Sequence, residues 1–131
     1  MPPADIALFQ GEIAKAKRYI EFGYGSSTLY ASQLGIDTIS VENDRFYARA
    51  VASQLCGQSV RQILSEMGIT GEWGVPVFPN VEKARSYVTA PWDDKPFPQF
   101  IPVDGGYRVA CALESARRAK IACLCIGGAN V

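Results

Sequence analysis

Hydrophobic positions in the first part of the chain change from a helical spacing to a short apolar run. Ile6, Phe9, Ile13 and Ala16 recur at intervals of three or four residues, which predicts an amphipathic helix. Residues 19–22 form a short run that two glycines soon interrupt, which predicts a strand. The chain therefore begins with a helix that can pack against a sheet.

The alternation of helix and strand continues toward the middle of the chain. Ser26 or Ser27 is predicted to cap a second helix, which runs to Leu34. Residues 38–42 are rich in β-branched side chains and predict a second strand. The Asn-Asp pair at 43–44 can cap the amphipathic helix that follows. This order predicts parallel βαβ units with helices on the faces of the sheet.

The pattern is less regular beyond the second strand and its helix. Residues 60–64 predict a third strand, whereas 67–80 and 86–98 are rich in glycine or proline and are predicted to be loops. A fourth strand is expected at 100–104, followed by a helix over 108–120. The second half of the chain should therefore extend the sheet through longer connections.

Two features near the end of the chain affect the expected sheet. Pro102 lies inside the fourth strand, where it cannot donate a hydrogen bond, so that strand should be bulged or have an unpaired side. Residues 121–126 could form a fifth strand. A sheet that ends there would have an apolar open edge, through which the chain could form a homo-oligomer.

Composition narrows the possible functions. The 131 residues are expected to form a single domain, because nearly half of them are hydrophobic and can bury a core. Thirteen basic and thirteen acidic residues balance, so a small-molecule ligand is favoured over nucleic acid. No apolar run is long enough to cross a membrane and no leader is evident, so we expect a cytoplasmic protein. The absence of histidine excludes imidazole bases, and the cysteine spacing matches no zinc site.

The glycine-rich turn after the first strand is the strongest candidate for a ligand site. Gly23 and Gly25 allow a sharp turn and a close approach of the backbone to a ligand. Thr28 stands where a dinucleotide fingerprint requires a third glycine. Glu21 would repel a pyrophosphate but suits a positive amino group, which S-adenosyl cofactors carry. Glu42, after the second strand, is placed to bind a ribose in either ligand class.

Three segments of the chain together resemble the successive motifs of class I methyltransferases that use S-adenosylmethionine. The resemblance extends over most of the chain and is closest to small, poorly characterised bacterial methyltransferase-like proteins, which residues 68–74 and 104–109 also resemble. It implies a Rossmann-like α/β fold, a three-layer sandwich with a mostly parallel sheet, here incomplete at its C-terminal end. The motifs are Glu21-x-Gly23-x-Gly25-Ser26-Ser27-Thr28, Val41-Glu42-Asn43-Asp44 and Val103-Asp104-Gly105.

The resemblance also implies roles for individual residues. Gly23 and Gly25 would flank the methionine part of the cofactor, Glu42 would hold the ribose, and Glu66 would face the adenine. Asp104 would face the reacting methyl group and is the candidate catalytic base. No metal is expected, because no acidic residue follows Glu114. The predicted cofactor-binding residues are Glu21, Gly23, Tyr24, Gly25, Ser26, Ser27, Thr28, Glu42, Asn43 and Glu66.

Two other functions are compatible with the same sequence. The chain could be a domain that binds a nucleoside ligand without turnover, because the resembled fold continues with further strands. It could also be an NAD-dependent oxidoreductase, although Thr28 and the lack of a recognisable catalytic tyrosine-lysine pair disfavour this. The methyl acceptor would be an unidentified small molecule.

Overall fold

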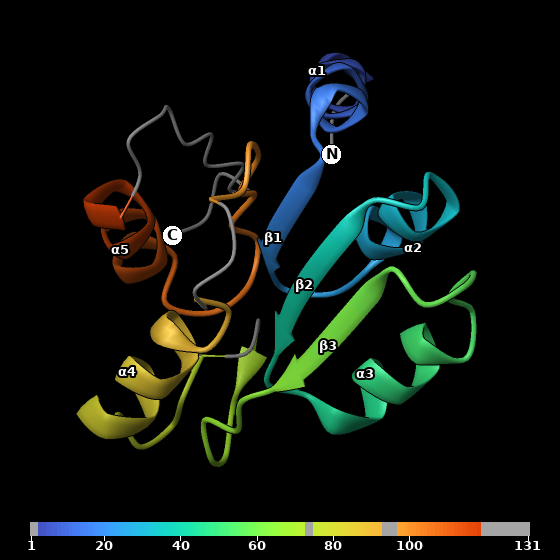
Figure 1. The fold of residues 1–131 in the computed structure, drawn as a ribbon. Helices are drawn as coiled ribbons and strands as arrows, with labels where there is room; N and C mark the ends of the chain where they lie inside the picture. The colour runs from blue at the N-terminus through green and yellow to red at the C-terminus, as the bar shows by residue number, and fades with distance from the viewer. Residues whose placement is uncertain (1–2, 73–74, 93–96, 119–131) are drawn as a thin grey trace.

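A computed structural model of the chain describes residues 3–72, 75–92 and 97–118. Three parallel strands form its sheet in the order β1-β2-β3, namely β1 (Arg18–Phe22), β2 (Asp37–Glu42) and β3 (Val60–Leu64). These bounds confirm the first three predicted strands. The described helices are α1 (Pro3–Lys15), α2 (Ser26–Gln33), α3 (Arg45–Ala52), α4 (Val81–Thr89) and α5 (Arg108–Arg118) (Figure 1).

Alternation of side chains along β1 divides the core between the two faces of the sheet. Tyr19 packs with residues of α1 and α2, including Phe9 and Ile13. Ile20 and Phe22 point to the opposite face, where they join a cluster formed partly by α4 and α5. Figure 1 shows these helix groups on opposite sides of the strands. The predicted three-layer α/β architecture is therefore confirmed.

The segment at 100–104 lies beside β1 but does not form a continuous strand. It makes parallel bridges from Phe100 to Tyr19 and from Val103 to Phe22. The Ile20 and Phe22 amides donate to this segment, and the second of these bonds ends on the carbonyl of Pro102 at 3.2 Å. In a regular ladder the amide at position 102 would donate back to β1, and proline has no such hydrogen. The predicted fourth strand is thus reduced to isolated bridges.

Two predictions need correction, one for the cap of α2 and one for the region that contains α4. Gly25, rather than Ser26 or Ser27, is the N-cap of α2, because both serine residues already lie inside the helix. Helix α4 was not predicted, and it occupies part of the proline-rich region assigned as loop. Asn80 caps it by accepting a hydrogen bond from the Lys83 amide at 3.0 Å. Residues 86–89, the first four of the predicted 86–98 loop, are thus helical, because the prolines lie beyond the helix end.

The end of the chain lies outside the described residues. The predicted strand at 121–126, the open edge that it would create and the last two residues of the helix predicted over 108–120 all fall within 119–131. Oligomerisation through that edge therefore stays a prediction. Within the described parts of the chain, no helix is both long and apolar enough to cross a membrane.

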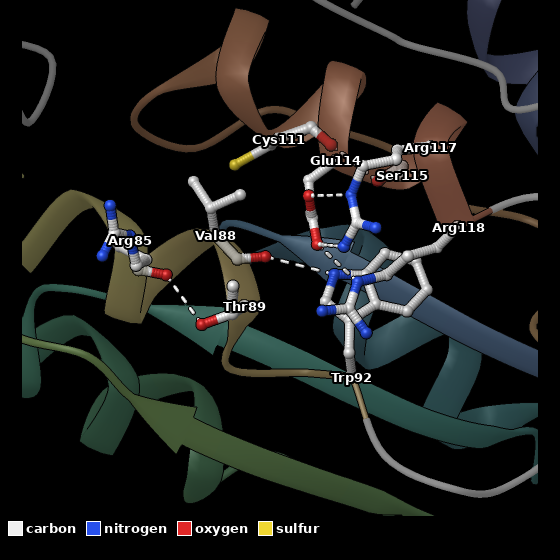
Figure 2. A network of polar contacts seen from close by, with 9 residues as sticks. All are labelled: Arg85, Val88, Thr89, Trp92, Cys111, Glu114, Ser115, Arg117 and Arg118. Atoms are coloured by element: carbon white, nitrogen blue, oxygen red, sulfur yellow. Dashed lines mark hydrogen bonds and ion pairs between the residues drawn. The ribbon is translucent and has the colours of Figure 1, made fainter.

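A polar network joins the last turn of α5 to the end of α4 (Figure 2). Glu114 accepts hydrogen bonds from Arg117 at 2.7 and 2.9 Å and forms an ion pair with Arg118. The Arg118 guanidinium also lies 5.3 Å from the centre of the Trp92 ring, whose indole nitrogen donates to the carbonyl of Val88. The network therefore extends from α5 to the residues that end α4.

The Glu114 network gives a prediction about pH and stability. Hydrogen bonds from Arg117, followed by those from Arg118, lower the pKa of the Glu114 carboxyl to about 2. A carboxyl with a lowered pKa stabilises the fold above its unfolded value of about 4.3, and the effect is lost as the pH falls toward 2. Glu114→Gln should therefore lower Tm by on the order of 1–3 °C at neutral pH, a small effect because the partner Arg117 is largely exposed to solvent.

The measurement is thermal unfolding followed by circular dichroism at about pH 7 and pH 3. The Tm difference between wild type and Glu114→Gln should shrink at the lower pH. Glu12→Gln is the matched control, because Glu12 pairs with exposed Lys15 on the surface of α1. A Tm difference for Glu114→Gln that is equal at both pH values would contradict the assigned role.

Candidate functional site

The main candidate site is a pocket of about 190 Å³ at the carboxyl end of β1. The sheet runs from β1 to β2 and β3 in one direction, whereas the segment at 100–104 lies on the other side of β1. Successive segments of the chain are thus added first on one side of β1 and then on the other. Open α/β sheets bind ligands at such a switch point. The pocket is lined from both sides of the reversal, by the turn after β1 and by Pro102 and Asp104.

Two glycines bring the walls of the pocket together. Gly23 has a φ of +99°, and a Cβ built on it would lie 2.9 Å from the amide nitrogen of Gly105. A Cβ on Gly105 would lie 3.0 Å from the amide nitrogen of Gly23. A Cβ on Gly23 would thus clash with the opposite backbone, and a Cβ on Gly105 would in addition overlap the hydroxyl oxygen of Tyr87. The turn after β1 and the Asp104-Gly105 turn therefore require glycine at both positions.

Glu21 places a buried carboxylate at the base of the pocket. Its side chain is 1% exposed and accepts hydrogen bonds from four hydroxyl groups. Ser40 donates to one oxygen at 2.6 Å, and Ser27 donates to the other at 2.7 Å. The remaining donors are Tyr19 and Thr28. A carboxylate offers about four acceptor positions, so the hydroxyl groups satisfy it fully.

The parallel register explains how the donors reach Glu21. Ser40 is the residue paired with Glu21 across β1 and β2, and Tyr19 lies two residues earlier on the same face of β1. Ser27 and Thr28 come from the first turn of α2, which folds back over the strand end. Burial raises the pKa of the Glu21 carboxyl above its usual value, and the hydroxyl donors oppose that rise. No donor among these four carries a positive charge.

Glu42 binds backbone amides at the end of β2. Its carboxylate accepts hydrogen bonds from the backbone amides of Tyr24, Asn43 and Asp44, at 3.1, 2.7 and 3.0 Å. The bond from Tyr24 ties the glycine turn to the end of β2. Glu42 is 8% exposed and does not line the pocket. In this structure it therefore holds the turn in place.

Asp104 lies at the open side of the pocket. Its side chain is 64% exposed, and its carboxylate is 3.5 Å from the guanidinium of Arg108 at the start of α5. The Asp104 amide donates to the carbonyl of Phe22 at 2.9 Å, which fixes the residue at the end of β1. Arg108 also donates to the carbonyl of Gly105. Asp104 is thus accessible, and its backbone is anchored.

Several residues that line the pocket were not predicted. Phe9 reaches it from α1, and Tyr47 reaches it from the first turn of α3, where its hydroxyl lies 3.3 Å from the position of a Cβ on Gly25. Pro102 and Phe22 complete this apolar part of the lining. Sequence spacing identifies Phe9 only as a core position, and no local signal distinguishes Tyr47. Pro102 lies two residues before the predicted site residue Asp104, which is the one sequence signal that could have placed it near the pocket.

The pocket brings together most of the predicted site residues. Thr28 lies just behind its wall, where it donates to Glu21. Glu42 and Asn43 lie at the end of β2, and Glu66 is exposed after β3. Among the described residues, no three acidic or cysteine side chains gather closely enough to hold a metal ion. The predicted residues that line the pocket are Glu21, Gly23, Tyr24, Gly25, Ser26, Ser27 and Asp104.

Comparison with known proteins identifies a structural relative. No family model matches the sequence, and neither does any curated protein. The fold matches the crystal structure of a methyltransferase-like protein from Silicibacter pomeroyi, with a TM-score of 0.74 and 34% sequence identity. The match covers 88% of this chain but only 65% of that protein. The chain thus shares the Rossmann-like fold of a methyltransferase-like protein, which confirms the resemblance indicated by its motifs.

Proposed function

We propose that the chain binds S-adenosylmethionine and forms the cofactor side of a methyltransferase that acts on a small-molecule acceptor. The observation that carries this proposal is the charge of the pocket. Glu21 supplies a carboxyl group without a cationic partner, Asp104 supplies a second that pairs with Arg108, and no described lining residue is lysine or arginine. A pocket of this composition favours a cationic ligand and disfavours a pyrophosphate.

The aromatic lining supports the same ligand. Phe9, Tyr24 and Tyr47 contribute rings to the pocket, and the faces of such rings attract cations. S-adenosylmethionine carries positive charge on its sulfonium and on its amino group. The adjoining N-terminus of α2 offers backbone amides to a carboxylate, which the same ligand also carries. The described residues thus fit the methionine end of the cofactor.

The size of the pocket limits which part of the cofactor it can hold. Ligand pockets usually enclose roughly 300–1,000 Å³, and this one has a volume of about 190 Å³. The residues predicted for the ribose and adenine, Glu42 and Glu66, lie outside its lining. The pocket is therefore assigned to the methionine and sulfonium portion. The nucleoside would extend along the carboxyl ends of β2 and β3.

For methyl transfer, the main task of the chain is to align the methyl donor with its acceptor. The cofactor, when bound, provides a methyl group on a positively charged sulfur. Gly23 and Gly25 let the backbone approach the donor, and the apolar rings exclude water around it. Asp104 is positioned to accept a proton from an acceptor hydroxyl at the open side of the pocket. Arg108 holds the Asp104 carboxylate beside that opening.

The first test of this function is a ligand panel. Thermal shift and isothermal titration calorimetry should show that S-adenosylmethionine and S-adenosylhomocysteine stabilise the chain, whereas NAD does not. A ligand present at 100 times its Kd raises stability by about 2.7 kcal/mol, which is readily measured. Stabilisation by NAD alone would instead indicate an oxidoreductase. The absence of any shift would indicate a domain without a nucleoside cofactor.

The second test concerns Asp104. Asp104→Asn should lower kcat by about 10²–10⁴-fold with an acceptor that the wild type methylates, because it removes the base. Binding of S-adenosylhomocysteine should change little. Turnover is followed as S-adenosylhomocysteine formation.

Asp37→Asn is the matched control for this substitution. Asp37 is a similarly exposed aspartate that pairs with Arg18 at 3.3 Å, at the opposite end of the sheet. The control should retain wild-type turnover. An unchanged kcat in Asp104→Asn would remove Asp104 from the mechanism.

A further inference from the structure

Tyr87 lies at the junction between the two turns that form the pocket. It is fully buried and belongs to α4, the helix that the sequence pattern did not predict. Its ring centre is 5.8 Å from that of Phe22, the last residue of β1, and 6.2 Å from that of Tyr107. Tyr87 therefore contacts Phe22, which precedes the glycine turn, and Tyr107, which ends the turn that carries Asp104.

The hydroxyl of Tyr87 lies directly against Gly105. A Cβ built on Gly105 would overlap the phenol oxygen, and it would also lie 3.1 Å from the carbonyl carbon of Phe22. The Tyr87 oxygen and the backbone of the glycine turn therefore both surround the position that a Cβ on Gly105 would take. The oxygen occupies the volume that a methyl group at position 105 would need.

The turn from Asp104 to Tyr107 is also constrained at Tyr107, its last residue. Tyr107 has a φ of +52°, a left-handed conformation that is costly for a residue with a side chain. Its ring packs on Tyr87, and both rings join the core cluster on the α4 and α5 face of the sheet. Tyr87 thus contacts the Asp104-to-Tyr107 turn at its glycine and at its strained residue.

We propose that Tyr87 is a positioning residue whose hydroxyl sets the spacing between the glycine turn after β1 and the turn that carries Asp104. This spacing determines how far the Asp104 carboxylate lies from a ligand held by Gly23 and Gly25. The inference rests on the proposed function for the identity of the ligand. The geometry of the two turns is independent of that identity.

A residue that only filled the core would act differently. Tyr87→Phe keeps the buried ring, so a purely structural role predicts no specific link between the hydroxyl and position 105. The positioning role predicts that the two substitutions are coupled. Gly105→Ala should force the turns apart because the new methyl group overlaps the Tyr87 oxygen, and Tyr87→Phe should provide the space that it needs.

The test uses four proteins, which are the wild type, Tyr87→Phe, Gly105→Ala and the double variant. The first readout is the amide resonance of Gly23 in ¹⁵N–¹H spectra, which reports on the opposite turn without any ligand. It should shift in Gly105→Ala and return most of the way in the double variant. Recovery should be incomplete, because the contacts of the new Cβ with the Phe22 and Gly23 backbone remain.

The second readout is the Kd for S-adenosylhomocysteine. Overpacking should weaken binding in Gly105→Ala by roughly 5- to 150-fold, and the double variant should recover about half of that loss on a logarithmic scale. Gly11→Ala is the control, because a Cβ on Gly11 of α1 would meet nothing within 4 Å. It should leave both readouts unchanged.

The outcomes separate this inference from the proposed function. Recovery of the Gly23 resonance in a chain that does not bind S-adenosyl ligands would support the positioning role and refute the function. Ligand binding by the wild type without recovery in the double variant would overturn the positioning role. If Gly105→Ala does not fold, Tyr87→Phe alone should still shift the Gly23 resonance, and an unmoved resonance would overturn the inference.

Discussion

The buried carboxylate of Glu21 is the constraint on which the site depends. Removing a charge from water is costly unless hydrogen bonds replace the lost solvation, and here hydroxyl groups alone provide them. The donors come from β1, β2 and the first turn of α2. Satisfying one carboxylate therefore fixes the strand register, the start of α2 and the path of the glycine turn between them. Because no donor is cationic, the negative charge remains available to attract a positive ligand.

The second half of the site depends on a close contact between two turns. Gly23 and Gly105 approach each other so closely that a side chain at either position would press on the opposite turn, and this contact brings Asp104 beside the glycine turn. Pro102 weakens the hydrogen-bond ladder between its segment and β1, so hydrogen bonds alone attach this segment less firmly than a regular strand. Tyr87 lies against the same contact from the core side. Packing from α4 and α5 thus compensates for the incomplete strand pairing.

Local sequence signals predict the first half of this structure better than the second. The strands β1 to β3 and the glycine turn follow from short apolar runs punctuated by glycine and Asx residues, which act over a few positions. Helix α4 was missed because glycines and prolines on either side of it obscure a short helical pattern. The ribose role of Glu42 stays a prediction, and the three backbone amides that its carboxylate also binds become apparent only when β1 and β2 are side by side. The contributions of Phe9, Tyr47 and Tyr87 likewise depend on packing between distant segments.

The pH dependence of S-adenosylmethionine binding tests the central claim most directly. If the negative charge of Glu21 attracts the cofactor, affinity should fall as the pH is lowered from about 7 to 4 and the carboxyl becomes protonated. This loss should occur above the usual glutamate range, because burial raises the pKa of Glu21. Glu21→Gln should bind more weakly and show no such pH dependence. A wild-type Kd that stays constant over this range, or equally tight binding by Glu21→Gln, would contradict the account.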